Sequence, residues 1–363
     1  MDSLRATLTD NAPFWLAVGG LAIGAFFGAV VALTNFCTMG SISDMLAFGD
    51  SRRFRAWVLA TATAVVGAAA LSAVGAVDLS KSMYLAPTFD WAGSIVGGLM
   101  FGLGMVFAGG CASRNLVRAG SGDLRSALVV VLIGVSGYMT IGGLLGPARA
   151  ALASATAVNL GAYGLKNQGL GALLTHASGL DPTRADLVAA AALAIALLAF
   201  CFWDARFRAS AKHIASGLGV GLAAVAGWAL TGLCYDEMAD GAVAPGSLSF
   251  VRPSGDTLEW IERFTAQRIP GFGVATVLGV LAGALVASLL TGRFRLATFS
   301  DTPDTLRNVV GATLMGVGGV VGLGCTIGQA VTGVSTLAIG SILVFVAIVA
   351  GGAIGIKAME RLA

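Results

Sequence analysis

The chain has 363 residues, of which 56% are hydrophobic and only 11% are charged, and its mean hydropathy is +0.86. A water-soluble globule of this size cannot bury so many apolar residues, so an integral membrane protein is predicted. The net charge of +3 requires no nucleic-acid partner, because the basic residues lie in short loops where they set orientation.

Nine membrane-spanning helices are predicted from the distribution of charge. Eight stretches lack Asp, Glu, Lys and Arg, and each approaches or exceeds the ~20 apolar residues that cross a bilayer as a helix. The last stretch, 308–356, has room for two helices. We expect the first helix to be retained, because Arg5 is the only basic residue before it and the helix is long enough to span. The predicted spans are 14–36, 55–77, 91–110, 126–146, 186–203, 214–233, 270–291, 308–324 and 334–356.

The short loops predict an orientation, because basic residues concentrate on the cytoplasmic side of membrane proteins. With the N-terminus outside, fourteen of the 22 Lys and Arg residues lie on the inner side. Six of the other eight lie in the long loops 147–185 and 236–269, which count for little in this rule. We therefore expect a multi-pass protein of the bacterial inner membrane with its N-terminus outside and its C-terminus inside.

Two pairs of similar stretches end in cysteine. "ALTNFC" ends at Cys37 and "ALTGLC" at Cys234, while "GLGMVFAGGC" ends at Cys111 and "GVGGVVGLGC" at Cys325. Within each pair the predicted helices run in opposite directions. One transmembrane domain over 1–363 is therefore predicted, all-α, with inverted repeats at about 14–148 (helices 1–4) and 214–356 (helices 6–9), linked by helix 5 at about 186–203. Inverted repeats place a substrate site near the midplane.

Small and polar residues follow three of these cysteines, as "TMGSIS", "ASRN" and "TIGQAVTG". Such segments favour short re-entrant helices, which are tolerated at membrane depth where they line a cavity or pack in protein. Chance is the alternative explanation, since Ala, Leu, Val and Gly are common in this chain and a buried cysteine is often a small hydrophobic residue.

The pattern suits a soft anion. The backbone N–H groups at the start of a short helix present a positive dipole end, and a buried thiol stays neutral and donates a weak hydrogen bond. Arg114 and Arg118 follow Cys111 and would attract anions at the inner mouth, or else only mark the cytoplasmic edge.

The segments "GGCASRNLVRAG" (109–120) and "GLGCTIGQAVTGVS" (322–335) resemble those of the YeeE/YedE sulfur-transport family, and the resemblance extends over essentially the whole chain. It implies an hourglass-shaped protein of nine spanning helices and short re-entrant ones. It also implies that Cys37, Cys111 and Cys325 hand thiosulfate inward, with Gly110 and Gly324 allowing close backbone approach. A cytoplasmic TusA-like sulfur carrier is the partner that the resemblance suggests.

Cys234 fits the repeat, but Asp236 and Glu237 follow it, and carboxylates do not suit an anion path. Cys201 has no glycine approach and is expected to pack. His176 and His213 have no second histidine at ligand spacing, so no metal is predicted, and no cofactor motif occurs. Asp44 and Asp123 are expected to cap or solvate inner loops, and they are the candidates if protons are coupled.

Two classes of function remain open. The favoured hypothesis is a permease, not an enzyme, for thiosulfate or another soft anion such as sulfite or a selenium compound. The alternative is a membrane thiol enzyme or sulfur-relay protein that forms persulfides, although the chain has no C-x-x-C pair. A Cu(I) channel is disfavoured, because helix N-termini repel cations.

Overall fold

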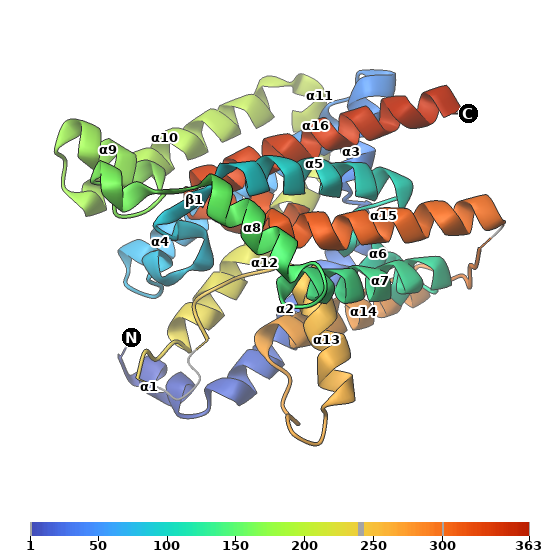
Figure 1. The fold of residues 1–363 in the computed structure, drawn as a ribbon, viewed down its shortest axis with the longest axis horizontal. Coiled ribbons are helices and arrows are strands. Elements are labelled where there is room, and N and C mark those ends of the chain that lie inside the picture. The colour runs from blue at the N-terminus through green and yellow to red at the C-terminus, as the bar shows by residue number, and fades with distance from the viewer. Residues whose placement is uncertain (1, 239–242, 300, 363) are drawn as a thin grey trace.

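Long helices make up most of the molecule (Figure 1). The computed structural model describes residues 2–238, 243–299 and 301–362. Every predicted span is a helix, and the ends differ by a few residues; the span predicted from 308, for example, begins at Thr302. The nine long helices are α2 (Ala12–Thr34), α4 (Arg52–Ala73), α5 (Trp91–Phe107), α7 (Leu124–Ile141), α10 (Pro182–Trp203), α12 (Ala211–Leu233), α14 (Phe272–Leu290), α15 (Thr302–Val321) and α16 (Ile339–Leu362).

Among the described residues, eight helical stretches are long and apolar enough to cross a membrane. The ninth long helix, α15, is not one of them, because Asp304 and Arg307 near its start lower its hydropathy. The chain is an all-α integral membrane protein that crosses the bilayer several times.

Short elements connect the long helices. Two of the predicted loops contain helices that the charge pattern did not reveal, namely α8 and α9 in 147–185 and α13 in 236–269. Strand β1 (Thr88–Asp90) pairs antiparallel with β2 (Ala157–Asn159), with Thr88 opposite Asn159. The short helices are α1 (Asp2–Asp10), α3 (Thr38–Phe48), α6 (Ala112–Gly120), α8 (Gly146–Thr156), α9 (Leu170–Ser178), α11 (Ala205–Arg208), α13 (Arg252–Glu262), the 3₁₀ turns η1 (Leu79–Lys81), η2 (Met83–Leu85) and η3 (Leu160–Tyr163), and the π-helix η4 (Ile327–Gly333).

Helices from the two halves of the chain interleave. α2 packs on α14 and α12, α4 packs on α12, and α5 lies between α15 and α16. Figure 1 shows this mixing as α5 running beside the last two helices of the chain. α10 packs mainly on α4 and α9 and leaves much of its apolar surface exposed, as a helix that faces lipid does.

Glycines bring the backbones of α2 and α14 into contact. A Cβ added to Gly24 would overlap the carbonyl oxygen of Thr276, and one added to Gly283 would overlap that of Ala25. Small residues at such crossings are what membrane helices need, because close van der Waals packing replaces the hydrophobic effect inside the bilayer. This crossing packs α2, the helix that precedes Cys37, against the C-terminal half of the chain. We call residues 35–48, which follow α2, the Cys37 segment.

Candidate functional site

Cys37, Cys111 and Cys325 share one local turn. The residue two positions before each cysteine has a left-handed backbone: Asn35 (φ 59°), Gly109 (φ 66°) and Leu323 (φ 58°). The left-handed residue ends the long helix, and the cysteine then precedes a short one, α3, α6 or η4. As predicted, a short helix follows each of the three cysteines.

Backbone N–H groups at two of these helix starts point at sulfur. The N–H of Gly40 donates to Cys37 Sγ at 3.4 Å, and that of Gly328 donates to Cys325 Sγ at 3.3 Å. Cys111 Sγ instead accepts from Thr38 Oγ1 at 3.8 Å and lies 3.3 Å from Ser113 Oγ. The Thr38 contact joins the Cys37 segment to the Cys111 segment, which lies more than 70 residues away in the chain.

Carboxamide side chains brace two of the helix starts. Asn115 Nδ2 donates to Gly110 O at 2.8 Å, and Gln329 Nε2 donates to Gly322 O at 2.7 Å. Each amide stands four residues after a cysteine. Gly110 and Gly324, which the sequence analysis singled out, are buried and pack against these same side chains; a Cβ on Gly324 would lie 3.2 Å from Gln329 Cγ.

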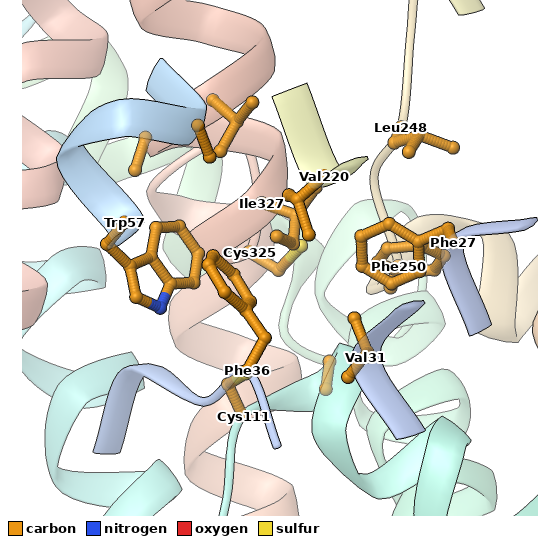
Figure 2. Packing of buried hydrophobic residues seen from close by; sticks show 14 of the residues in the cluster. Phe27, Val31, Phe36, Trp57, Cys111, Val220, Leu248, Phe250, Cys325 and Ile327 are labelled. Carbon is orange, nitrogen blue, oxygen red and sulfur yellow. The ribbon is translucent and has the colours of Figure 1, made fainter. Parts of the chain in front are cut away.

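The three thiols lie in the buried centre of the molecule. Cys111 is 1% exposed and Cys325 is fully buried, within one hydrophobic cluster that includes Phe36 and Trp57. Figure 2 shows both cysteines among these aromatic side chains, with Phe250 close by. Cys37 follows Phe36 directly and is also buried, and its thiol is free, as are those of the other cysteines. Three segments that are distant in sequence therefore contribute to one core.

The other two cysteines have different surroundings. Cys201 Sγ donates to Arg55 O at 3.3 Å and packs in the core, in agreement with its predicted role. Cys234 caps the end of α12 in a right-handed conformation, and an irregular segment follows it instead of a short helix. The stretches "ALTNFC" and "ALTGLC" thus have four of six residues in common but differ in backbone conformation.

Charged side chains surround the start of the Cys37 segment. Arg114 Nη2 donates to Asn35 Oδ1 at 3.0 Å, and Arg53 Nη2 donates to Asn35 O at 3.4 Å. Arg53 also pairs with Asp44 at 3.0 Å. Among the described residues no ion pair joins Arg114 to a carboxylate, so its half-buried guanidinium keeps its positive charge unneutralised beside Cys37 and Cys111.

Asp123 occupies the turn between α6 and α7 and caps α7, as its predicted role requires. Its carboxylate pairs with Arg118 at 2.6 Å and with Arg125 at 3.2 Å. Burial opposes ionisation of Asp123, but hydrogen bonds from Arg125 and the charge of Arg118 outweigh burial and hold its pKa below the usual value. Asp123 is therefore ionised at neutral pH and unsuited to carrying protons there.

One buried segment was not predicted. Residues 245–251 lie in the long loop 236–269, yet Leu248 and Phe250 are fully buried, and Thr332 Oγ1 donates to Leu248 O at 2.7 Å. Phe250 packs on Phe27 with ring centroids 5.1 Å apart. The signal in the sequence was a run without charge, "GAVAPGSLSFV" at 241–251, inside the predicted loop.

Metal chemistry finds no support in the described part of the chain, where no group of three His, Cys, Asp or Glu side chains could hold an ion. The arrangement offers neutral thiols, hydroxyls, helix N-termini and one unneutralised guanidinium around a buried core. Such groups bind anions weakly through hydrogen bonds.

Comparison with known proteins shows the family to which the chain belongs. The profile described as sulphur transport matches residues 33–354. The thiosulfate transporter TsuA of Spirochaeta thermophila is 28% identical over 344 residues, covering 92% of this chain and 96% of that protein. TsuA of Escherichia coli K12 is 27% identical over 345 residues, covering 87% of each chain. The probable transporter YedE of E. coli K12 is 29% identical over 110 residues, which are 29% of this chain and 25% of that protein.

Proposed function

Because this chain belongs to the sulphur transport family, we propose that it is a permease that takes up thiosulfate or a closely related sulfur oxyanion. Its similarity to two proteins named thiosulfate transporters, over most of each chain, supports this substrate. The proposal assigns the central path to Cys37, Cys111 and Cys325.

The observation that carries the proposal is the meeting of three cysteine segments in one buried core. A buried thiol donates an S–H, so an anion that passes between the three cysteines meets soft donors, with the Arg114 guanidinium beside Cys37 and Cys111. α3 and α6 add the positive ends of their dipoles. Gly110 and Gly324 let the backbone at each helix start approach the anion closely.

Arg114 holds the anion at the inner end of the path. Its guanidinium lies beside the Cys37 segment and has Asn35 Oδ1 as its hydrogen-bond partner at 3.0 Å. A carboxylate at this position would neutralise the attraction. Cys234, whose helix end is followed by the pair of Lys81 with Glu237 at 2.8 Å, lies toward the outer entrance and contributes little.

The architecture that accompanies this function is a pair of inverted repeats, at about 14–148 and 214–356, forming an hourglass. The reciprocal packing supports it, because α4 lies on α12 as α14 lies on α2. The N-terminus is outside and the C-terminus inside, in the bacterial inner membrane. Reporter fusions should place residues near 53 and 208 in the cytoplasm and residues near 84 and 170 outside; the opposite pattern refutes this orientation.

Moving a dianion into a cell that is negative inside costs about 4.6 kcal/mol per 100 mV, from ~2.3 kcal/mol per charge. Consumption of the anion by a TusA-like sulfur carrier in the cytoplasm offsets this cost. The carrier keeps the free concentration of the anion low at the inner mouth, so net flow continues inward.

Uptake of radiolabelled thiosulfate into proteoliposomes that contain only this protein tests the function. We expect saturable uptake, competed by sulfite and selenium analogues according to their fit. A membrane thiol enzyme would instead leave the vesicle interior unlabelled and carry a persulfide on a cysteine, visible as a 32 Da increase in the intact mass. These two results together would overturn the proposal that the protein is a permease.

A further inference from the structure

Buried polar atoms without partners gather near the cysteines. Among the described residues, eight buried side-chain nitrogen or oxygen atoms have no hydrogen-bond partner. Four of them belong to Trp57, Asn115, Thr326 and Gln329, which lie on or pack against the cysteine segments. An unpartnered buried donor destabilises a folded protein, so the two donors among these atoms, Trp57 Nε1 and Thr326 Oγ1, call for a ligand that accepts their hydrogen bonds.

Trp57 supplies the clearest donor. It is 1% exposed, and its indole ring stacks on Phe36, the residue before Cys37, with centroids 4.6 Å apart. One turn further along α4, Thr61 Oγ1 donates to Ala330 O of η4 at 2.8 Å. α4 thus contacts both the Cys37 segment, through Trp57, and η4, through Thr61. Figure 2 shows the Trp57 ring against Phe36, with Cys325 beyond Phe36. The Nε1–H of Trp57 has no acceptor among the described residues.

A second tryptophan shows that this chain can satisfy a buried indole. Trp228 in α12 is fully buried, and its Nε1 donates to Ser335 Oγ at 2.9 Å. Ser335 in turn donates to Thr332 O at 2.6 Å. Trp260 Nε1 in α13 also has no acceptor, so Trp57 is distinguished by its position against Phe36, the residue before Cys37.

Thr326 adds a hydroxyl at the other side of the same cluster. It follows Cys325 directly, is fully buried, and its Oγ1 has no partner. A hydroxyl rotates to suit its acceptor, so it can donate to an anion while the neighbouring thiol faces the same anion.

Asn115 and Gln329 contribute acceptors rather than donors. Their amide nitrogens are occupied by Gly110 O and Gly322 O, which leaves Asn115 Oδ1 and Gln329 Oε1 as the free atoms. Carbonyl oxygens repel the oxygens of an anion. They therefore favour the orientation in which those oxygens face Trp57 and Thr326.

We propose that Trp57 Nε1–H and the Thr326 hydroxyl bind the oxygen atoms of the transported anion, while the thiols bind its sulfur. This assignment rests on the proposed function and narrows it: the site selects anions that carry both a polarisable sulfur and hydrogen-bond-accepting oxygens. Hydrosulfide has no oxygen atom, so it lacks the contacts with Trp57 and Thr326 and keeps only those with the thiols. Both donors are neutral, so they hold the anion without trapping it.

The test measures the binding of thiosulfate and hydrosulfide to the purified protein by calorimetry, together with the thermal unfolding midpoint without ligand. Trp57→Phe keeps an aromatic ring but removes the N–H together with part of the indole's volume. We expect its Kd for thiosulfate to rise about 10- to 100-fold, the loss typical of one hydrogen bond to a charged group, with no change for hydrosulfide. The cavity lowers its unfolding midpoint, but by less than in Trp228→Phe, because the two variants lose the same volume and only Trp228→Phe also loses a partnered N–H.

Trp228→Phe is the matched control, since it removes a partnered indole N–H. We expect a lower midpoint and an unchanged Kd for thiosulfate. Thr326→Val, which keeps the shape of the side chain, is the second variant and should raise the Kd for thiosulfate selectively. The inference fails if Trp57→Phe and Thr326→Val bind thiosulfate as the wild type does, or if Trp57→Phe loses as much stability as Trp228→Phe does. Failure of the wild type itself to bind thiosulfate refutes the proposed function instead.

Discussion

Asn115 and Gln329 make equivalent hydrogen bonds at two helix starts that lie more than 200 residues apart in the chain. Asn115 Nδ2 reaches back to Gly110 O at 2.8 Å, and Gln329 Nε2 reaches back to Gly322 O at 2.7 Å. The Asn115 bond ties α6 to the turn before Cys111, and the Gln329 bond ties η4 to the C-cap residue of α15. The positions of Cys111 and Cys325 in the core therefore depend on these two amides.

Replacing either amide should uncouple its helix start. Asn115→Leu leaves the carbonyls of Gly110 and Cys111 without this partner, and Gln329→Met does the same for Gly322, so each should lower stability by about 1–3 kcal/mol. Thiosulfate uptake should fall by more than the loss of stability explains, because the thiol of Cys111 or Cys325 moves when its helix start is released. Thermal unfolding in detergent and uptake in vesicles measure the two effects.

Asn308→Leu is the control for the amides. Asn308 Nδ2 donates to Asp304 O at 2.7 Å within α15, away from the cysteines. This variant should lose some stability and transport normally. Equal loss of transport in all three variants would assign the amides a purely structural role.

Cysteine-to-alanine variants should fall into two groups according to their thiosulfate uptake. Cys111→Ala and Cys325→Ala should abolish uptake while the protein stays folded, because each removes a thiol from the proposed path. Cys201→Ala should keep near-normal uptake, since its sulfur packs in the core and donates to Arg55 O, away from the proposed path. Uptake assays on vesicles with matched protein content decide this, and normal transport by both Cys111→Ala and Cys325→Ala would end the thiol-path hypothesis.

Leu323 should be a site of strain. A left-handed backbone costs a side-chain-bearing residue roughly 1–2 kcal/mol, and Leu323 has φ 58° where the equivalent turn before Cys111 has Gly109. Leu323→Gly should therefore stabilise the protein by about 1 kcal/mol, and Gly109→Leu should destabilise it by a similar amount. A lower unfolding midpoint for Leu323→Gly would show that packing of the leucine outweighs the strain.

Asp123 should make stability depend on pH. Its folded pKa lies below the unfolded value of ~3.9, so its stabilisation is fully present above that pH and is lost as the pH falls through the folded pKa. Asp123→Asn keeps the helix cap but loses the charge that faces Arg118 and Arg125. We expect it to be less stable than the wild type at pH 7, with the difference shrinking below about pH 4.

Unfolding midpoints measured from pH 3 to pH 7 give this comparison. Asp181→Asn is the control, because Asp181 also caps a helix, accepting from Arg184 N at 3.4 Å, and is exposed. Among the described residues no ion pair joins Asp181 to a basic side chain, so this variant shows the effect of losing a capping carboxylate alone. A difference for Asp123→Asn that stays constant over this range would contradict the ion-pair explanation.

The spanning helices were predictable because the bilayer sets their length and excludes charge from it. Charge-free runs therefore located all nine long helices, including α15. The helix α13 and the buried segment 245–251 were missed, because a long loop of mixed polarity carries no such length signal. Leu248 and Phe250 are buried by contacts with distant residues such as Phe27, and local sequence does not reveal those contacts.

The short helices after three cysteines were predictable from repeated glycines and small polar residues. The difference between Cys37 and Cys234 was predicted only in part: Asp236 and Glu237 set Cys234 apart, but the left-handed turn at Asn35, where the other copy has Gly232, was not predicted. The contact of Arg114 with Asn35 joins positions 79 residues apart, and the orphaned indole of Trp57 depends on its neighbours in space. Partners of this kind follow from tertiary packing alone.

The left-handed residues Asn35, Gly109 and Leu323 fix the number of residues between the end of each long helix and the cysteine that follows it. Only one residue separates each of them from its cysteine, so the chain has no slack between the end of one helix and the start of the next. An inserted residue would rotate the following short helix by about 100° and carry its thiol away from the core. Single-residue insertions and deletions at 36, 110 and 324 should therefore be far less tolerated than substitutions, and a homologue that lengthens any of the three turns has lost that thiol's place in the site.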